Sequence, residues 1–472
     1  MSETGAAARG GWLDLMRGGR GVFTVLLNLA VILHGVNTFV LSTVMPSVIA
    51  DVGGAAYYAW PAMMYLIGTI VGAASGTPVR AALGRRHGYV ASGFVFVAGS
   101  AVAALAPSMA FLLAGQLLQG FGGGLLLSQS MALVREIYDG PLRGRILALI
   151  NATWVAAAMI GPAEAGFFAA VEWWRGAFWV AVPFALLVCA LGWRYVPPSG
   201  EPGTRAGFPV RRLALVAAGV LCVAAAGQIE SIPAGIALVI AACALVRFTM
   251  RLDEGSDNAL FPRRALSPLT DVGAAYWMFM TLAFTQIAPA VFLPLLLGAL
   301  HGVPALWVGY YNMAMSIAWS VGSFAVAHVT RRDTTRRAIA LGFVVSTVGL
   351  AGMAVGIESH PLWLLAVWSV VIGLGIGISN VLAITWTMSI AAEGEESLTA
   401  SAIPAIRSLG LAFGAAAIGL VANASGLGDA TDPARVARAL TAVFAVCAFA
   451  PVAGFAMTFL SFAANARRRA SG

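Results

Sequence analysis

The stretch LLAGQLLQGFGGGLLLSQS, residues 112–130, is apolar enough to lie in a lipid bilayer, yet it contains five glycines and three glutamines. Gln116, Gln119 and Gly123 recur at helical spacing, so these residues share one face of a helix. In a membrane, small residues let helices approach closely, and buried amides hydrogen-bond between helices. The stretch therefore predicts a membrane helix that faces protein or a water-filled cavity. The pattern leaves open whether its glutamines serve packing or transport.

The composition of the whole chain extends this prediction. Of 472 residues, 60% are hydrophobic and 10% are charged, and the mean hydropathy is +0.87. Soluble globular proteins are about 45–50% apolar and about 25% charged. We therefore expect an all-α integral membrane protein with many membrane-spanning helices. The first apolar run is too long for a cleavable signal peptide, so we expect it to remain as a helix.

The charge and the cysteines exclude several kinds of partner. The formal net charge is +8, but the basic residues occur in short clusters between apolar runs and form no single stripe. The four cysteines, Cys189, Cys222, Cys243 and Cys447, lie inside apolar runs without the spacing of metal ligands. We expect no nucleic-acid partner, no metal and no cofactor.

Apolar runs of about 20 residues can cross the roughly 30 Å hydrocarbon core as helices. Fourteen runs approach or exceed this length. They lie near residues 22–45, 57–77, 88–106, 109–133, 146–169, 176–194, 213–229, 232–250, 272–298, 304–329, 337–356, 362–390, 398–423 and 437–463.

The positions of the 28 basic residues, all arginine, support this count. Positive residues in short loops stay on the cytoplasmic side of a membrane. With fourteen helices and both termini in the cytoplasm, nearly all arginines fall on that side. The exceptions are Arg175, Arg435 and Arg438 outside, and Arg407 within a helix. One missed helix would invert every later loop, so this alternation favours fourteen.

Two long polar connections surround the helices predicted between residues 213 and 250. They divide the chain into three parts. We predict an N-terminal six-helix bundle at 1–196, cytoplasmic linkers with two extra membrane helices at 197–266, and a C-terminal six-helix bundle at 267–472.

Five motifs together resemble one family. QLLQGFGGG at 116–124 resembles the fourth-helix motif RxxQGxGxG, and MIGPAEAGFF at 159–168 resembles the fifth-helix antiporter motif GPxxGG. LGRRHGYV at 83–90 resembles the loop between helices two and three, and EWWRGAFWVAVP at 172–183 resembles the entry to helix six. IRSLGLAFGAA at 406–416 resembles a stretch near the end of the same proteins. The family is the major facilitator superfamily, in its fourteen-helix drug:proton antiporter branch.

This resemblance implies a transporter of two helical bundles that works by alternating access, with substrate bound near the membrane midplane. It further implies export of amphipathic organic compounds in exchange for protons. Three positions depart from the family pattern. Gln116 stands where the family has Arg, Ala81 where it usually has Asp, and Asn37 where the drug-exporting branch has Asp. An amide cannot take up and release a proton near neutral pH, so the usual residues do not supply proton coupling here.

Two titratable residues remain as proton-coupling candidates. Glu164 lies in GPAEAG at 161–166, and a carboxylate within a membrane helix is costly and generally functional. The alternative is that Glu164 lies near the outer end and reaches water. His34 lies one turn from Asn37 on the first helix, where it could assist coupling, contact substrate or hold structure by a hydrogen bond.

Arg407 must have its charge paired or solvated within its helix. It could face the substrate cavity or extend along the helix toward Glu393, Glu395 and Glu396 at the cytoplasmic end. Other polar and aromatic residues in the predicted helices are candidates for the cavity wall. The full set of cavity candidates is Asn37, Gln116, Gln119, Tyr65, Gln286, Asn312, Asn380, Trp386 and Arg407.

A further set of residues is expected to serve gating or helix packing. It comprises Gly84, Arg85, Arg86, Gly120, Gly123, Gly161, Pro162 and Gly166. We expect Asp271 to cap the helix predicted at 272–298 rather than to bind substrate. Tyr57, Tyr58 and Trp60 are expected at the outer membrane interface, where aromatic residues are enriched.

These features favour a secondary active transporter in the inner (plasma) membrane. Its expected partners are a small-molecule substrate, protons and the lipid bilayer, and it is expected to be a monomer. The neutral motif positions keep open a proton-independent facilitator or importer of a small metabolite, or a non-transporting membrane sensor. An enzyme is not expected, because the sequence contains no HExxH, GxSxG or nucleotide-binding loop.

Overall fold

The computed structural model describes residues 11–53, 60–198, 209–226, 229, 231–256, 258–303, 305–357, 361–426 and 433–471. All regular structure in these residues is helical. In chain order the helices are η1 (Trp12–Leu15), α1 (Arg20–Val52), α2 (Trp60–Ala104), α3 (Met109–Ile137), α4 (Gly140–Ala170), α5 (Gly176–Trp179), α6 (Ala181–Tyr195), α7 (Val210–Ala226), α8 (Ile232–Asp253), α9 (Asp271–Leu295), η3 (Leu296–Leu300), α10 (Ala305–Val326), α11 (Arg332–Gly356), α12 (Leu362–Ser389), α13 (Glu396–Ala424), α14 (Pro433–Cys447) and α15 (Phe449–Ser471).

Many of these helices have the length and composition of membrane helices. Among the described residues, 11 helical segments are long and apolar enough to cross a membrane. α7, with 17 residues, and the apolar segment Met313–Val326 within α10 are shorter. The predicted all-helical membrane fold is thus confirmed.

α2, with 45 residues, is a hairpin of two helices. Gly84 has φ 78° and ψ 173°, a conformation that glycine adopts easily because it has no Cβ. A Cβ on Gly68, before this point, would meet Phe121 of α3 at 2.8 Å. A Cβ on Gly99, after it, would meet Cα of Gln119 of α3 at 2.5 Å. Both halves of α2 contact the same stretch of α3, so the chain reverses at Gly84.

Two helices predicted from hydropathy are interrupted at one residue. The span predicted at 176–194 corresponds to α5 and α6, and the span predicted at 437–463 corresponds to α14 and α15. Each pair still forms one segment that is long and apolar enough to cross a membrane, Gly176–Tyr195 and Ala434–Ala470. In each case a proline lies in the first turn after the break, Pro183 in α6 and Pro451 in α15. Proline has no N–H and clashes with the carbonyl four residues earlier, which disfavours an unbroken helix at that point.

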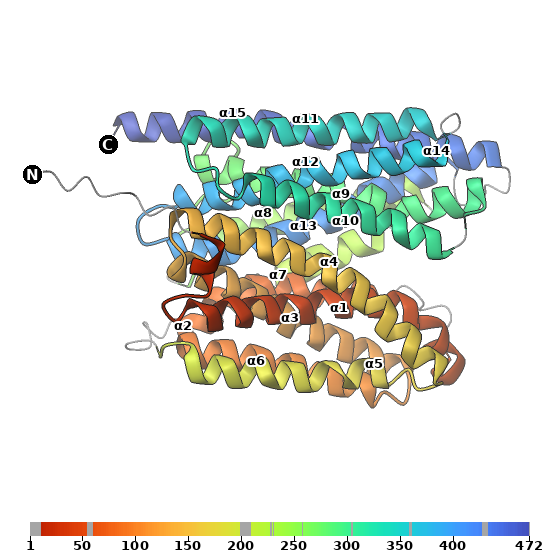
Figure 1. Cartoon of the computed structure of the whole chain (residues 1–472), viewed down its shortest axis with the longest axis horizontal. Helices are drawn as coiled ribbons and strands as arrows, with labels where there is room; N and C mark the ends of the chain where they lie inside the picture. Colours follow the sequence, from red (N-terminus) through yellow and green to blue (C-terminus); the bar gives the residue numbers. More distant parts are fainter. Residues whose placement is uncertain are drawn as a thin grey trace, which may run out of the picture.

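The helices form two bundles, α1–α6 and α9–α15, as Figure 1 shows. α7 and α8 pack against each other and against α2 and α13, one helix from each bundle. Ile67 and Ile70 of α2, Val220 of α7, Ala242 of α8 and Leu409 of α13 belong to one buried apolar cluster. The two extra helices therefore cover the line along which α2 meets α13.

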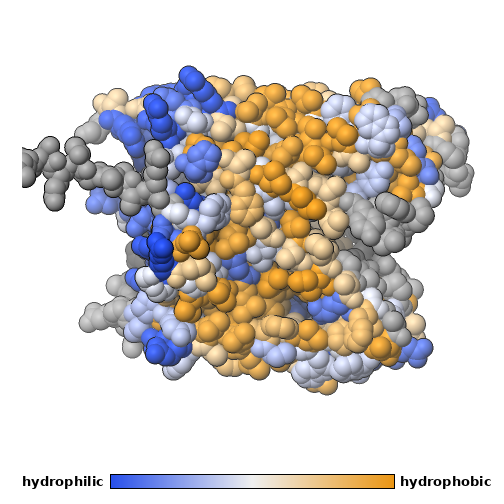
Figure 2. Space-filling view, viewed as in Figure 1, coloured by the Kyte–Doolittle hydropathy of each residue, from blue (hydrophilic) through white to orange (hydrophobic). Residues whose placement is uncertain are grey.

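The surface separates into an apolar middle and a polar end. Figure 2 shows hydrophilic residues gathered at the end where α15 terminates, and apolar residues across the middle. Arg85 follows the Gly84 turn of α2, Arg143 and Arg332 lie in the first turns of α4 and α11, and Arg468 lies in the last turn of α15. We call the side of the molecule where α15 ends the arginine-rich end. Apolar side chains such as Phe111, 56% exposed, project from the middle, as expected for helices in contact with lipid.

Candidate functional site

The N-terminal bundle holds a buried polar cluster where α1, α2, α3 and α4 meet. The Tyr65 hydroxyl lies 2.7 Å from His34 Nδ1 and 3.2 Å from the His34 carbonyl oxygen. The rings of His34 and Tyr65 stack at 5.2 Å, and the Trp154 ring meets His34 edge-on at 5.8 Å. A hydroxyl has one proton, so it donates either to Nδ1 or to the carbonyl while accepting from Nδ1–H. The pair can therefore accommodate either ring tautomer.

Glycine makes room for this pair on α3. A Cβ at Gly123 would lie 2.7 Å from His34 Nδ1 and 3.4 Å from the Tyr65 hydroxyl. A Cβ at Gly120 would overlap the carbonyl oxygen of Tyr65. Because any side chain would displace α3 from α1 and α2, both glycines are needed for the observed packing.

Amide groups beside this pair lack hydrogen-bond partners within the described part of the chain. They are Asn37 Nδ2, both polar atoms of the Gln116 amide, and Gln119 Oε1. Gln119 Nε2 does donate to Ser100 Oγ at 2.6 Å, so Gln119 joins α3 to the second half of α2. Gln116 lies one turn before Gly120, on the face of α3 that meets Tyr65. An unpartnered buried polar group costs about 1–3 kcal/mol, so the Gln116 amide and Asn37 Nδ2 remain candidates for contact with a polar ligand.

Neutral side chains join the two bundles. Thr77 Oγ1 lies 2.7 Å from Ser401 Oγ, and Ser128 Oγ donates to the Ser401 carbonyl at 2.8 Å. These residues connect α2 and α3 of one bundle to α13 of the other. Thr77 and Ser401 each lie within a few turns of the arginine-rich end of their helix.

Asn151 of α4 forms the second connection between the bundles. Its Nδ2 donates to Ser323 Oγ at 3.0 Å, and its carbonyl accepts from Ser320 Oγ at 3.4 Å. Asn380 Nδ2 of α12 lies 3.5 Å from Asn151 Oδ1. Trp154 follows Asn151 by one turn, so the buried His34 cluster borders this connection. Toward the opposite end the ribbons of α4 and α10 diverge (Figure 1).

The C-terminal bundle contributes Arg407 from α13. Its Nη2 donates to Gln286 Oε1 of α9 at 3.2 Å, and its guanidinium lies 5.1 Å from the Trp319 ring centroid. Trp319 is adjacent to Ser320, which contacts Asn151. Arg407 thus lies among α9, α10 and α13, while Glu395 forms its ion pair with Arg263 at 3.8 Å.

Glu164 lies farther along α4. Its side chain is partly buried and has no hydrogen-bond or ion-pair partner among the described residues. Gly161, one turn earlier, packs on α1, where its Cβ would meet Phe39 Cβ at 2.7 Å. At about 1.5 Å rise per residue, Glu164 lies about 20 Å along the helix from Asn151, away from the arginine-rich end.

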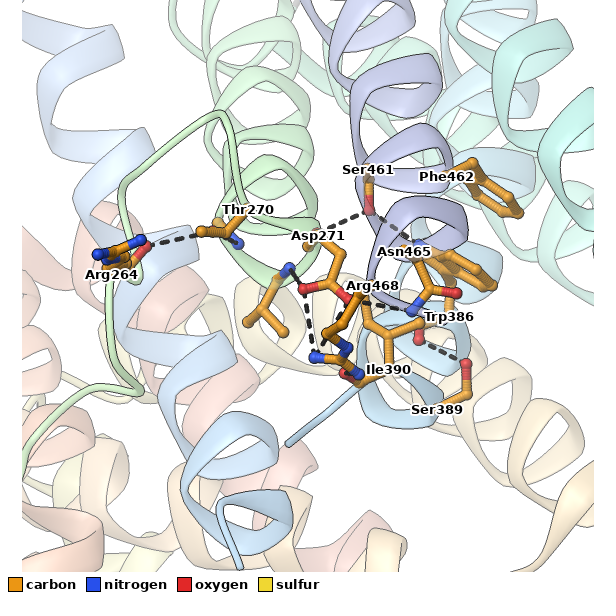
Figure 3. Close-up of polar contacts among 12 residues, drawn as sticks. Arg264, Thr270, Asp271, Trp386, Ser389, Ile390, Ser461, Phe462, Asn465 and Arg468 are labelled. Carbon is orange, nitrogen blue, oxygen red and sulfur yellow. Dashed lines mark hydrogen bonds and ion pairs between the residues drawn. The ribbon is translucent and has the colours of Figure 1, made fainter. Parts of the chain in front are cut away.

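Trp386 lies in the packing of the C-terminal bundle. Its ring stacks on Phe462 of α15 at 3.7 Å, and its Nε1 donates to Ser461 Oγ at 2.9 Å (Figure 3). It is 6% exposed. The structure therefore places Trp386 between α12 and α15, away from Arg407 and the bundle connection.

Asp271 does not cap α9. The N-cap is Thr270, whose hydroxyl accepts from Gly273 N–H at 3.1 Å. The Asp271 carboxylate accepts from Val272 N–H at 2.9 Å and from Asn465 Nδ2 at 2.9 Å, and it pairs with Arg468 at 3.2 Å (Figure 3). Asp271 was wrongly predicted as the cap because Thr270, one residue earlier, is also a residue type that caps helices, and the sequence pattern does not choose between the two.

Some predicted residues fall outside what the structure describes. The side chains of Asn312 and Pro162, and residues Tyr57 and Tyr58 entirely, lie outside the described residues. Asn151, Trp154, Trp319 and Ser401 were missed. An Asn in the apolar run 146–169 was a usable signal for Asn151, because buried amides in membrane helices generally bind a neighbouring helix.

Comparison with known proteins agrees with this architecture. Residues 27–415 match the sequence profile described as Major Facilitator Superfamily. The chain belongs to this superfamily.

The sequence matches to relatives in the major facilitator superfamily cover most of the chain. A probable multidrug-efflux transporter of Mycobacterium tuberculosis is 33% identical over 466 residues, covering 96% of this chain and 97% of the relative. The multidrug transporter protein MdtP of Bacillus subtilis is 23% identical, covering 84% of this chain and 74% of its own. Members of this superfamily are transporters, so the chain is a multi-pass membrane transporter and not an enzyme.

Solved structures show the major facilitator fold. The human organic anion transporter MFSD10 matches with a TM-score of 0.67 at 16% identity, covering 93% of this chain and 99% of its own. The proton:xylose symporter XylE, bound to 6-bromo-6-deoxy-D-glucose, matches with a TM-score of 0.62 at 16% identity, covering 92% and 94%.

The loop motif of this major facilitator protein holds the N-terminal bundle together. Arg85 pairs with Glu136 of α3 at 3.5 Å, and Arg80 pairs with the same carboxylate. Arg86 Nε donates to the Val196 carbonyl, at the end of α6, at 2.8 Å. These contacts join α2 to α3 and α6 within one bundle.

Proposed function

We propose that this chain exports amphipathic organic compounds across the inner (plasma) membrane in exchange for protons, by alternating access. The 33% identity to a probable multidrug-efflux transporter over nearly the full length of both chains supports the export of such compounds. The arginine-rich end supports an orientation with both termini in the cytoplasm, since positive residues stay on that side.

The proposal includes a count of fourteen helices in a 6 + 2 + 6 arrangement. Counting α2 as two helices, and adding α7 and α10 to the 11 apolar spans, gives fourteen. The bundles are then residues 1–196 and 267–472, with α7 and α8 between them. In this orientation the hydrogen bonds of Thr77 and Ser128 with Ser401, which join the bundles, lie toward the cytoplasm.

The connection through Asn151 and Ser401 is the observation on which the alternating-access part rests. The hydrogen bonds named above that join α2, α3 and α4 to α10, α12 and α13 involve neutral groups. Each such bond contributes about 0.5–1.5 kcal/mol, so separating the bundles here costs little per contact. The bundles can then separate at this end and close at the other.

The substrate route in this proposal lies beside the connection. On one side it has Trp154 and the His34–Tyr65 pair with the Gln116 amide, and on the other side Trp319 and Arg407. Aromatic faces with a few polar groups suit amphipathic organic ligands. Gln286 holds Arg407 in place.

Glu164 is the proposed proton carrier. Its carboxylate is partly buried and has no partner among described residues, so no cation is in place to hold it ionised. His34 is the second choice, because the Tyr65 hydroxyl can form a hydrogen bond with its ring in either tautomer.

The test is dye transport by everted vesicles under an imposed pH gradient, with cationic and neutral fluorescent dyes. Wild-type protein should show gradient-driven flux. Glu164→Gln should reduce this flux to background yet still bind dye and allow dye counterflow. Glu172→Gln is the matched control, since it removes a carboxylate from the exposed connection after α4 and should leave flux unchanged. Equal flux in Glu164→Gln and wild type would reject Glu164 as the carrier.

A second candidate function is a proton-independent facilitator of a small metabolite. Gln116 and Asn37 are neutral at positions where the family pattern has charged residues, and this favours a facilitator. Initial flux that is insensitive to pH and membrane potential in wild-type vesicles would establish this alternative and reject antiport.

A further inference from the structure

A large cavity lies away from the connection between the bundles. Its volume is about 1030 Å³, at the upper limit of the roughly 300–1,000 Å³ of small-molecule pockets. Its walls come from α8, the connection that follows it, α9, α13, and the α14–α15 region. Thus α9, α13, α14 and α15 of the second bundle and the extra helix α8 surround it.

Three arginines line this cavity, Arg247, Arg251 and Arg264. All three are exposed, and none of their guanidinium groups forms a hydrogen bond or ion pair with another described residue. Of the two carboxylates that line the same cavity, Asp253 is already occupied. It pairs with Arg212 and accepts from the N–H groups of Leu260 and Phe261, each at 2.8 Å.

Glu254 is the second carboxylate, and it lies exposed beside Asp253. Three unpaired arginines against one exposed carboxylate leave an excess of positive charge. The cavity therefore offers guanidinium donors to an anion at its polar end.

The connection after α8 positions one of these arginines. Arg264 has φ 55°, in the left-handed region that residues other than glycine rarely adopt. Its carbonyl accepts from Ser267 N–H at 2.9 Å, and Trp277 Nε1 donates to the Leu266 carbonyl at 2.9 Å, which fastens the turn to α9. In Figure 3 the Arg264 side chain points away from the Asp271 network.

The rest of the cavity wall is apolar. Trp277, Met280 and Phe284 line it along α9, and Leu409 and Phe413 line it along α13. These positions extend about 10 Å along α9 from Trp277, away from the arginine-rich end. At the rim, Leu269 is 81% exposed and Phe449 is 72% exposed. The arginines at one end of the cavity suit the charged headgroup of a membrane lipid, and the apolar wall behind them suits its acyl chains.

We propose that this cavity is a binding site for an anionic phospholipid. The phosphate binds Arg247, Arg251 and Arg264, and an acyl chain lies against Trp277, Phe284 and Phe413. Basic pockets between membrane helices on the cytoplasmic side bind anionic lipid headgroups by the same physics. Because the cavity lies between α8 and the second bundle, the lipid joins the extra helices to that bundle.

The test measures lipid binding directly and does not depend on transport. Purified full-length protein is incubated with phosphatidylglycerol or phosphatidylcholine of identical acyl chains, and retained lipids are counted by native mass spectrometry. Wild type should retain phosphatidylglycerol in preference to phosphatidylcholine. The triple variant Arg247→Gln, Arg251→Gln, Arg264→Gln should bind phosphatidylglycerol at least about tenfold more weakly than wild type. The reason is that each basic side chain near a membrane surface attracts anionic lipid.

The control variant is Arg337→Gln, Arg467→Gln, Arg469→Gln, which removes the same charge from exposed positions outside the cavity. It should bind phosphatidylglycerol as wild type does. A second variant, Ala450→Phe, leaves the arginines intact but fills the cavity, and it should also weaken phosphatidylglycerol binding. Equal retention of both lipids by wild type, or equal losses in the two triple variants, would overturn the proposal. The proposal would also be overturned if the variant with all three cavity arginines replaced lost binding of a transported dye but still bound phosphatidylglycerol.

Discussion

At the scale of single residues, the His34–Tyr65 pair shows what spacing can and cannot predict. The sequence placed His34 and Asn37 on one face of the first helix, which their separation along a helix determines. The hydrogen-bond partner, Tyr65, follows 31 residues later on another helix. Helical periodicity gives the face of a residue but not the neighbour that the face meets, so Tyr65 could be proposed only as a cavity wall.

Removing the Tyr65 hydroxyl should destabilise the protein. Tyr65→Phe leaves His34 Nδ1 without a partner in a buried site, which costs about 1–3 kcal/mol. Thermal unfolding of purified protein should therefore occur at a lower temperature than in wild type. Tyr195→Phe is the control, because Tyr195 is 42% exposed and its hydroxyl makes no hydrogen bond with a described residue. Equal unfolding temperatures for the two variants would show that the His34–Tyr65 bond contributes no stability.

At the scale of elements, most helices could be predicted because hydropathy and length determine which segments enter the membrane. The breaks before Pro183 and Pro451 were missed, since a window of about 20 residues averages over one interrupted turn. The tight packing of α3 was foreseen from its glycines. Which glycine faces which helix depends on the rotation of each helix, and no local pattern contains that rotation.

Two glycines predicted to serve packing should respond differently to alanine. At Gly120 a Cβ would overlap the carbonyl oxygen of Tyr65, while at Gly166 nothing lies within 4 Å. Overpacking costs about 1–3 kcal/mol or more, so Gly120→Ala should reduce both the yield of folded protein and transport. Gly166→Ala should be neutral or stabilise α4 by about 0.5–1 kcal/mol, because alanine loses less backbone freedom in a helix. Size-exclusion profiles and thermal unfolding of both variants check this; a well-folded, active Gly120→Ala would refute the close approach.

At the scale of the whole molecule, two bundles joined by a small set of neutral hydrogen bonds could be predicted only in outline. The composition and motifs indicated the bundles and the two extra helices. They gave no position for α7 and α8 against α2 and α13, because apolar faces in lipid do not specify a partner by hydrophobicity alone. The connection at Asn151 and Ser401 likewise depends on how the bundles dock.

A disulfide across this connection should stop transport. Thr77 Oγ1 and Ser401 Oγ are 2.7 Å apart, so cysteines at both positions are close enough to cross-link when oxidised. In a background with the four native cysteines replaced by alanine, oxidation should reduce dye flux to background, and dithiothreitol should restore it. Each single cysteine variant, oxidised in the same way, should keep its flux. Full flux in completely cross-linked protein would exclude separation of the bundles at this end.

The contacts of Asp271 have a consequence for how the chain is made. Its partner Asn465 follows 194 residues later, and Ser461, which binds Trp386 and the Asp271 carbonyl, is on the same final helix. During translation the first bundle can assemble while the ribosome is still extending the chain, because its helices are already synthesised. The second bundle must wait, with Asp271 and Trp386 lacking their partners on α15, until α15 has left the ribosome. Chaperones and quality-control proteases that act on nascent membrane proteins would therefore meet this half in an incomplete form for longer than the first.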